Sequence, residues 1–362
     1  MAMKTKVAIY SKRAFPQEIL DELEKLSEIS KTEALERALN YLLRELPEKN
    51  RSLWAKISYE IELTKFMRSK VFARAGVFAW TLRPRDFKAL EAIYNLPSVK
   101  TLGDVAEIKE GDMTRQEEKK VEEKESLEAV IDDDYYRVIR GRNVKPYCII
   151  WEGSYLKKEH ARKIDEKRLM RRILVRDVAP CIMAAVPDMP YRCLRTVYCI
   201  ELKKRESEKP EIVEVFNKWL NNEEKAWAVA LHYLAGLFNS KLINALYYAL
   251  FYMSQMSPRE GNFRFRSQFL QPLPIVVPKS KGEFEKCYRI AEKSMKMAMI
   301  SRKTLGRRGK NLEELKMLTK RYRDIQVRID ALVNDLFKAP RIDQEYYLHY
   351  LGEGRESGLY IG

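Results

Sequence analysis

RRILVRDVAPCIMAAVPDMPYRCLRTVYCIEL, residues 171–202, contains the main strand-forming part of this chain. The runs at 172–176 and 181–186 are rich in apolar residues, and so is the run that ends at 202. Pro187 and Pro190 lie in a turn signal before the last run. The pattern predicts two strands, a turn and a third strand. Helical patterns lie on both sides of it, so we predict the α+β class.

The most apolar stretch follows at 231–253, LHYLAGLFNSKLINALYYALFYM. It is long enough to span a bilayer. However, Asn239, Ser240, Lys241 and Asn244 lie at its middle, and a central lysine costs about 2.5–3.5 kcal/mol on membrane insertion scales. We therefore predict one or two buried helices of a soluble protein, with no membrane partner.

The stretch GNFRFRSQFLQPLPIVVP, residues 261–278, alternates aromatic and polar side chains. In an extended chain Phe263, Phe265 and Phe269 face one way, and Arg264 and Arg266 face the other. Two interpretations remain open from the segment alone. It is an edge strand with a solvated basic face, or a strand that holds two guanidinium groups against an anion.

Residues 279–338 show helical spacing again, with a break at GRRGKN, 306–311. An apolar heptad seam runs through the second helix at Leu315, Leu318, Tyr322, Ile325, Ile329, Leu332 and Leu336. We predict an antiparallel helical hairpin in a C-terminal region that spans 279–362. The seam is either filled inside the chain or is a docking surface for a second subunit.

The first 50 residues read as a strand at 6–10 followed by two helices, with a capping box at Ser30 and Glu33. This order resembles a ribbon-helix-helix DNA-binding module, and that resemblance implies that Lys6, Ala8 and Tyr10 face the bases. The alternative is a plain helical hairpin packed on the next domain. Residues 51–100 read as a mixed connector without recognisable chemistry.

The 362 residues include 68 Lys and Arg against 52 Asp and Glu, which gives a formal net charge of +16. Such a charge is typical of a protein that binds the phosphate backbone. It also fits an anionic membrane surface or a basic subunit of a larger complex. The five cysteines have no C-x-x-C spacing and there are only three histidines. We therefore predict no metal site and reduced core cysteines in a cytoplasmic protein, and the N-terminus shows no signal peptide.

The sequence contains no P-loop, no G-x-S-x-G and no glycine-rich cofactor loop after a strand. Asp188, Glu201 and Lys203 fit a PD…ExK nuclease pattern, which would use Mg²⁺. The two carboxylates must converge on the metal, but a straight strand would place them on the order of 40 Å apart. The nuclease is therefore an alternative reading.

Several segments between residues 101 and 278 resemble one family. These are LGDVAEIKEG at 102–111, VIRGRNVKPY at 138–147, RRILVRDVAP at 171–180, YRCLRTVYCIEL at 191–202, YLAGLFNSKLINALYY at 233–248 and FRSQFLQPLPI at 265–275. Together they resemble the TaqI-like C-terminal specificity domain, the target recognition domain of restriction–modification enzymes. The resemblance covers residues 101–278. It implies a mixed-sheet domain that reads a DNA sequence, with catalysis on another domain or a partner.

The resemblance also implies where DNA would be contacted. The family often has Gly-x-x-Thr-Gly after the first strand, whereas Gly111 and Thr114 are followed here by Arg115. Arginines bind phosphate or a guanine edge, and Asn262 could read adenine. The predicted DNA-binding residues are Thr114, Arg115, Arg140, Arg142, Asn143, Lys145, Arg259, Asn262, Arg264 and Arg266, with Lys6 and Tyr10 in the N-terminal module.

We therefore predict a sequence-specific, double-stranded DNA recognition subunit of a restriction–modification or related defence system. It would be non-catalytic and need no cofactor. Its partner would be a methyltransferase or nuclease subunit, or a second copy bound through the C-terminal helices. If the chain were catalytic, it would be a restriction endonuclease or a subunit of a DNA adenine methyltransferase. The other alternative is a ribbon-helix-helix transcription regulator.

Overall fold

The computed structural model describes residues 84–123, 134–204, 209–251, 263–305 and 312–338, together with residue 344. Helices and mixed sheets are both present, so the α+β class is confirmed. The predicted N-terminal module and most of the predicted connector lie outside the described residues. The first described helix is α6 (Pro84–Asn95), which belongs to that connector.

The central sheet has the strand order β10-β8-β12-β2, with every neighbouring pair antiparallel. Its strands are β10 (Ala184–Ala185), β8 (Arg172–Arg176), β12 (Val197–Leu202) and β2 (Ala106–Glu110). Three of these strands come from the run predicted to form two strands, a turn and a third strand. The strand predicted after the turn is not continuous: its beginning forms β11 (Arg192–Cys193), which joins a second sheet, and its end forms β12.

Both faces of the inner strands β8 and β12 are covered, which explains why these two strands are nearly continuously apolar. On one face Ile173, Tyr198 and Ile200 belong to the core shared with the helices. On the other face Leu174 and Cys199 belong to a smaller core under the second sheet. The helices of the larger core include α10 (Glu211–Leu220), α11 (Glu223–Phe238), α12 (Lys241–Phe251) and α14 (Lys281–Leu305).

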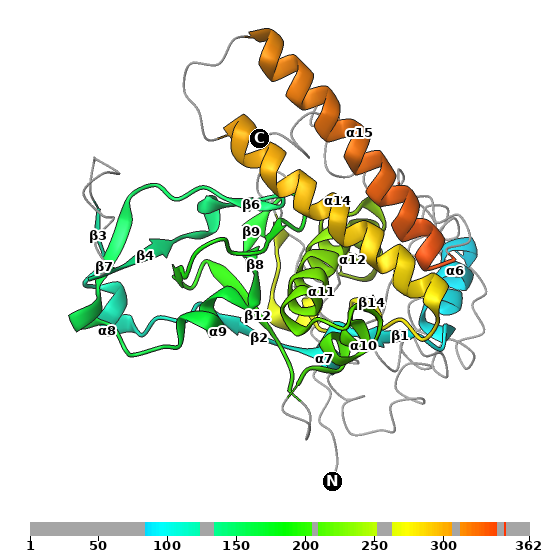
Figure 1. Ribbon diagram of the computed structural model, residues 1–362, viewed down its shortest axis with the longest axis horizontal. Helices are drawn as coiled ribbons and strands as arrows, with labels where there is room; N and C mark the ends of the chain where they lie inside the picture. The colour runs from blue at the N-terminus through cyan, green and yellow to red at the C-terminus, as the bar shows by residue number, and fades with distance from the viewer. Residues whose placement is uncertain are drawn as a thin grey trace, which may run out of the picture.

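The second sheet has the order β11-β4-β7-β3 and is mixed, because β11 pairs with β4 in parallel and the other pairs are antiparallel. It contains β4 (Tyr135–Ile139), β7 (Ser154–Lys157) and β3 (Glu122–Glu123). In Figure 1 these strands and the short helix α8 (Arg115–Glu118) lie at the opposite end of the molecule from α6. Smaller two-stranded pairings join β1 (Val99–Thr101) to β14 (Pro274–Val276), β9 (Val178–Ala179) to β13 (Phe263–Arg264), and β5 (Val144–Lys145) to β6 (Cys148–Ile149).

The apolar stretch at 231–253 contributes to α11 and α12, as the prediction of buried helices requires. Two asparagines in its middle bind the edge strand β10 and the chain just before it. Asn239 accepts a hydrogen bond from the backbone N of Ala184 (3.1 Å) and donates one to its carbonyl (2.8 Å), and Asn244 accepts one from the backbone N of Ile182 (2.7 Å). Within the described ranges, no helix has the length and apolar character that crossing a membrane requires.

The predicted antiparallel hairpin is confirmed as α14 and α15 (Leu312–Leu336). Lys286 near the start of α14 pairs with Asp335 near the end of α15 at 2.7 Å. The heptad seam is filled inside the chain, since Leu318, Tyr322 and Ile329 are buried in the main core. Of the two interpretations of the seam, packing within the chain is the one the structure shows.

Two segments contain short capped helices. Residues 101–111 include the helical turn α7 (Leu102–Val105) before β2, because Thr101 and Asp104 form a capping box. The charged segment after Gly111 contains α8, and Glu117 of that helix is only 4% exposed. The remaining short helices are η3 (Gly141–Asn143), η4 (Lys158–His160), α9 (Glu166–Met170) and α13 (Ser267–Leu270).

Candidate nucleic-acid interface

The single turn η3 holds Arg140 and Arg142 against the turn between β11 and β12. The backbone N of Gly141 donates to Oγ1 of Thr196 at 2.9 Å. A Cβ at Gly141 would lie 2.6 Å from the carbonyl oxygen of Thr196 and 3.2 Å from a carboxylate oxygen of Asp177. Only glycine therefore allows η3 to approach this turn so closely.

Asn143 does not lie on the surface, contrary to its predicted role in binding DNA. It is 2% exposed, and its side chain closes η3. Its Oδ1 accepts from the backbone N of Arg140 at 2.7 Å, and its Nδ2 donates to the carbonyl of Ile150 at 2.8 Å. Because Asn143 is buried and its amide bonds the backbone at both ends, it holds the turn that carries the neighbouring arginines and does not reach a base edge.

The arginines of this turn make ion pairs at the surface. Arg140 binds Glu123 at 2.5 Å and Arg142 binds Glu152 at 2.7 Å, and Arg142 and both carboxylates are more than 40% exposed. Exposed pairs of this kind contribute about 0–1 kcal/mol. A phosphate can therefore replace either carboxylate at little cost. Lys145, at the end of β5, is half-buried.

The β8–β9 corner, which contains Asp177, contacts both η3 and the segment at 263–266. Phe263 and Phe265 are buried, and Arg264 and Arg266 are exposed, so the predicted alternation is confirmed there. The backbone N of Phe265 donates to the carbonyl of Asp177 at 2.7 Å. Asp177 also touches the site of Gly141, so one corner residue joins η3 to β13.

Asp177 gives this junction a specific electrostatic character. It is 8% exposed, and burial raises the pKa of its carboxyl, while Arg264 and Arg176 lower it. Two tyrosines of α12 support β13 from the core side, because Tyr247 packs against Phe265 and Tyr248 packs edge-on against Phe263. Both tyrosines are buried. These aromatic contacts thus support the segment that presents Arg264 and Arg266.

Thr114 and Arg115 reach the same turn from another direction. Gly111 has φ +59°, and a Cβ there would lie 2.9 Å from the carbonyl oxygen of Cys193. Thr114 is the N-cap of α8 and forms a reciprocal capping box with Glu117, at 2.7 and 3.2 Å. Its side chain is therefore used locally, whereas Arg115 is exposed.

The segment that carries Thr114 and Arg115 is fixed by a buried ionic network. Asp112 accepts hydrogen bonds from Arg172 (2.6 Å) and from Nε of Arg192 (2.8 Å). Arg192 also donates to Glu117 at 3.0 Å, and neither arginine is accessible to solvent. Burial raises the pKa of Glu117, but hydrogen bonds from Thr114, Arg162 and Arg192 lower it to about 2. The sequence reading missed this network, although arginines within the apolar strands RILVR and YRCLR were a signal for it.

Asp112, Cys193 and Cys199 lie close enough to share a metal ion. The place between them is taken by the guanidinium of Arg172. It donates to Asp112 at 2.6 Å and approaches both sulfurs at 3.4 Å. A cation of the protein thus satisfies this ligand set.

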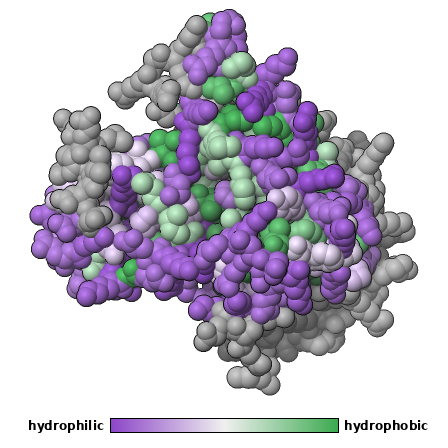
Figure 2. Space-filling view, viewed as in Figure 1, coloured by the Kyte–Doolittle hydropathy of each residue, from purple (hydrophilic) through white to green (hydrophobic). Residues whose placement is uncertain are grey.

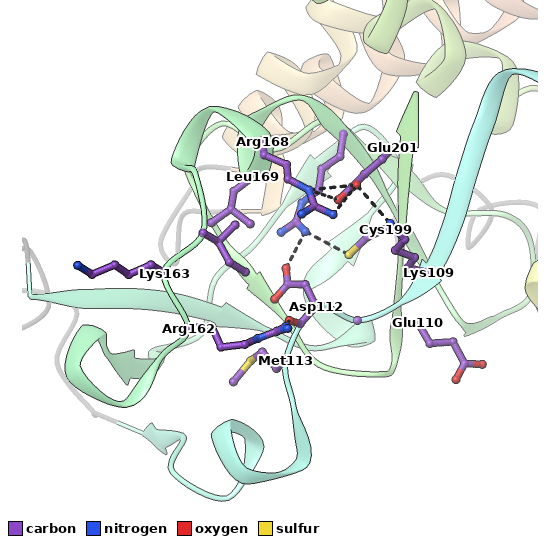
Figure 3. A pocket seen from close by; sticks show the side chains of 13 residues that line it. Lys109, Glu110, Asp112, Met113, Arg162, Lys163, Arg168, Leu169, Cys199 and Glu201 are labelled. Carbon is purple, nitrogen blue, oxygen red and sulfur yellow. Dashed lines mark hydrogen bonds and ion pairs between the residues drawn. The ribbon is translucent and has the colours of Figure 1, made fainter. Parts of the chain in front are cut away.

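A cleft of about 490 Å³ opens beside the network (Figure 3). At its rim Arg168 and Glu201 point toward one another, at 2.8 Å, and Lys109 lies 3.8 Å from the same carboxylate. These pairs neutralise much of the charge at the rim. The charged residues lining the cleft are Lys109, Glu110, Asp112, Arg162, Lys163, Arg168, Arg172 and Glu201.

The residues of the nuclease pattern have separate partners. Asp188 binds Arg302 at 3.0 Å and accepts from the Tyr191 hydroxyl at 3.1 Å. Glu201 is held by Arg168 in the cleft, and Lys203 donates to the carbonyl of Gly103. The structure does not bring the three side chains together. Four predicted DNA-binding residues lie outside the described residues: Lys6, Tyr10, Arg259 and Asn262.

Comparison with known families gives one match. Residues 136–275 match the model of the TaqI-like C-terminal specificity domain. The match includes η3, the β8–β9 corner and β13, and the strand β2 extends the same sheet from outside it. A search of curated proteins found no match.

Proposed function

We propose that this chain recognises a specific sequence in double-stranded DNA, because residues 136–275 match the TaqI-like C-terminal specificity domain. It would serve as the non-catalytic specificity subunit of a restriction–modification or related defence system. One observation carries the proposal. Within the matched domain, η3, the β8–β9 corner and β13 converge, and they present Arg142, Arg264 and Arg266 to solvent.

The chemistry of this surface suits duplex DNA. Arginine presents a planar fork of donors that fits a phosphate or the O6 and N7 atoms of guanine. The flanking Arg115 and Arg140 would contact phosphates, since phosphate contacts set the register of a protein on the duplex. The formal net charge of +16 would add long-range attraction.

We further propose that a methyltransferase or nuclease subunit, or a second copy of this chain, supplies catalysis or completes the assembly. The heptad seam is occupied within the chain, so a partner of the C-terminal hairpin would bind its outer surface. Apolar side chains of α15 are exposed there: Leu312, Met317 and Val327 are 64–65% exposed.

The test is selection of randomised duplex DNA by the purified chain at moderate salt, with EDTA present, followed by sequencing of the bound pool. We expect an enriched asymmetric motif of several base pairs. Retention without enrichment would contradict sequence recognition by the isolated chain. Magnesium-dependent cleavage of plasmid by the same preparation would contradict the non-catalytic role.

Substitutions at the arginines then test the assigned surface. Arg142→Gln and Arg264→Gln should each weaken binding to the selected sequence by about 1–3 kcal/mol if they contact bases, and relax the preference at one position. Lys218→Gln, at an exposed position of α10, removes the same charge and is the matched control. Equal affinities for all three variants would show that the surface is assigned wrongly.

A further inference from the structure

The C-terminal hairpin carries a cluster of cations that the recognition surface does not use. Arg289, Lys293 and Lys296 follow one another at spacings of four and three residues on α14, so they share one face of that helix. Arg328 lies on α15. We call these four residues the basic strip. Figure 2 shows that hydrophilic side chains cover much of the face on which the hairpin lies.

The register of the hairpin places the fourth cation beside the other three. Lys286 pairs with Asp335 at 2.7 Å, and the two helices are antiparallel. Lys293 lies seven residues after Lys286 on α14, and Arg328 lies seven residues before Asp335 on α15. Each step is about two helical turns, so Lys293 and Arg328 face each other across the hairpin.

The basic strip makes no ion pair with the part of the chain that the structure describes. Within the described part of the chain, none of its four residues has an acidic partner within ion-pair distance, although Lys286 and Arg302 of the same helix do. Burial lowers the pKa of Lys293, and the nearby Arg328, Lys296 and Arg289 lower it further, against the opposing effect of Glu292. The fold thus holds like charges together at an electrostatic cost.

We propose that the basic strip binds the phosphate backbone of duplex DNA outside the base pairs that the recognition surface reads. The inference rests on the proposed DNA binding of this chain, although not on its sequence specificity. From Arg289 to Lys296 the helix rises by about 10 Å. One strand of B-DNA presents about three phosphates over that length of its axis. Cations without internal partners can accept these phosphates without first losing an ion pair.

The test compares two triple variants of the full chain on a duplex of random sequence. Arg289→Gln, Lys293→Gln and Lys296→Gln remove three charges from the basic strip. Lys281→Gln, Lys320→Gln and Arg323→Gln remove three charges from other exposed positions of the same hairpin. Affinity is measured by fluorescence anisotropy over a series of KCl concentrations, after urea unfolding has shown that both variants are folded.

We expect the strip variant to bind more weakly and its dependence of log K on log salt to be shallower by about 2–3, because each phosphate contact contributes about 0.9 to that slope. The control should retain most of the slope of the unmodified chain. Equal slopes for the two variants would overturn the inference. It would be overturned equally if the strip variant kept the DNA slope and lost binding to an acidic protein. If the chain selects no DNA sequence, the proposed function fails, but a difference between the two slopes would still support the strip.

Discussion

Asp112 joins the two arginines that the fold buries most deeply. It accepts hydrogen bonds from both Arg172 and Arg192, whose side chains are at most 1% exposed. Asp112→Asn keeps the shape but leaves two buried guanidinium groups with one carboxylate, that of Glu117. Removing one partner of a buried ion pair typically costs about 3–5 kcal/mol. We expect a loss of this size in the free energy of unfolding, measured in urea.

Glu201→Gln is the matched control for this prediction. Glu201 lines the same cleft and also binds an arginine, but that partner, Arg168, is 53% exposed. Exposed pairs contribute about 0–1 kcal/mol, so this variant should unfold close to the unmodified chain. If the two variants were equally stable, the buried network would not be what holds the segment after Gly111.

Glu117 makes the stability of the domain depend on acid pH. Its pKa is lowered from the usual value near 4.5 to about 2 in the folded chain. The folded state therefore binds fewer protons than the unfolded state between these pH values, and stability falls as pH decreases through that range. In Glu117→Gln the unfolding free energy should be lower at pH 7 and should change less between pH 5 and 3. An unchanged acid slope would contradict the role assigned to this carboxylate.

Single residues differ in how far the sequence predicts their environment. The alternation of Phe263, Arg264, Phe265 and Arg266 could be read directly, because side chains of a strand alternate between its faces. The burial of Glu117 could not be, because a run of charged residues is usually solvated. Thr114 is a local partner, but Arg192 comes from β11 and Arg162 from the chain before α9, and no local pattern links those segments to α8.

At the scale of single elements, the position of η3 depends on Gly141. In Gly141→Ala the new Cβ would lie 2.6 Å from the carbonyl oxygen of Thr196, which is backbone and cannot rotate away. Overpacking of this kind typically costs about 1–3 kcal/mol. We expect a lower melting temperature and weaker binding to the selected DNA, since Arg140 and Arg142 would move with the turn.

Gly282→Ala is the control for that substitution, since nothing lies within 4 Å of the added Cβ and the position is helical. It should leave stability unchanged or raise it slightly, because alanine favours a helix over glycine. DNA binding by Gly282→Ala should not change. A melting temperature of Gly141→Ala equal to that of Gly282→Ala would mean that η3 does not need its close approach to the turn.

Elements differed in how far their sequence determined them. The helices α14 and α15 were predicted from their helical periodicity, and α11 and α12 were predicted from a long apolar stretch. The short helices α7 and α8 were not, since each is a four-residue turn fixed by a capping box and by contacts from elsewhere. The polar residues of the apolar stretch showed only that it was not a membrane span. The role of Asn239, which is to bind the edge strand β10, required the tertiary structure.

At the scale of the whole molecule, charge and sequence recognition should separate in their response to salt. The formal net charge of +16 attracts any duplex, so affinity for random DNA should fall steeply as KCl increases, with log K linear in log salt. Hydrogen bonds to base edges release no counterions. The ratio of the affinities for selected and random duplexes should therefore change much less than either affinity, and competition titrations at several salt concentrations would measure it. If this ratio fell to one as salt weakened the contribution of the phosphate contacts, the protein would have a basic surface and no sequence recognition of its own.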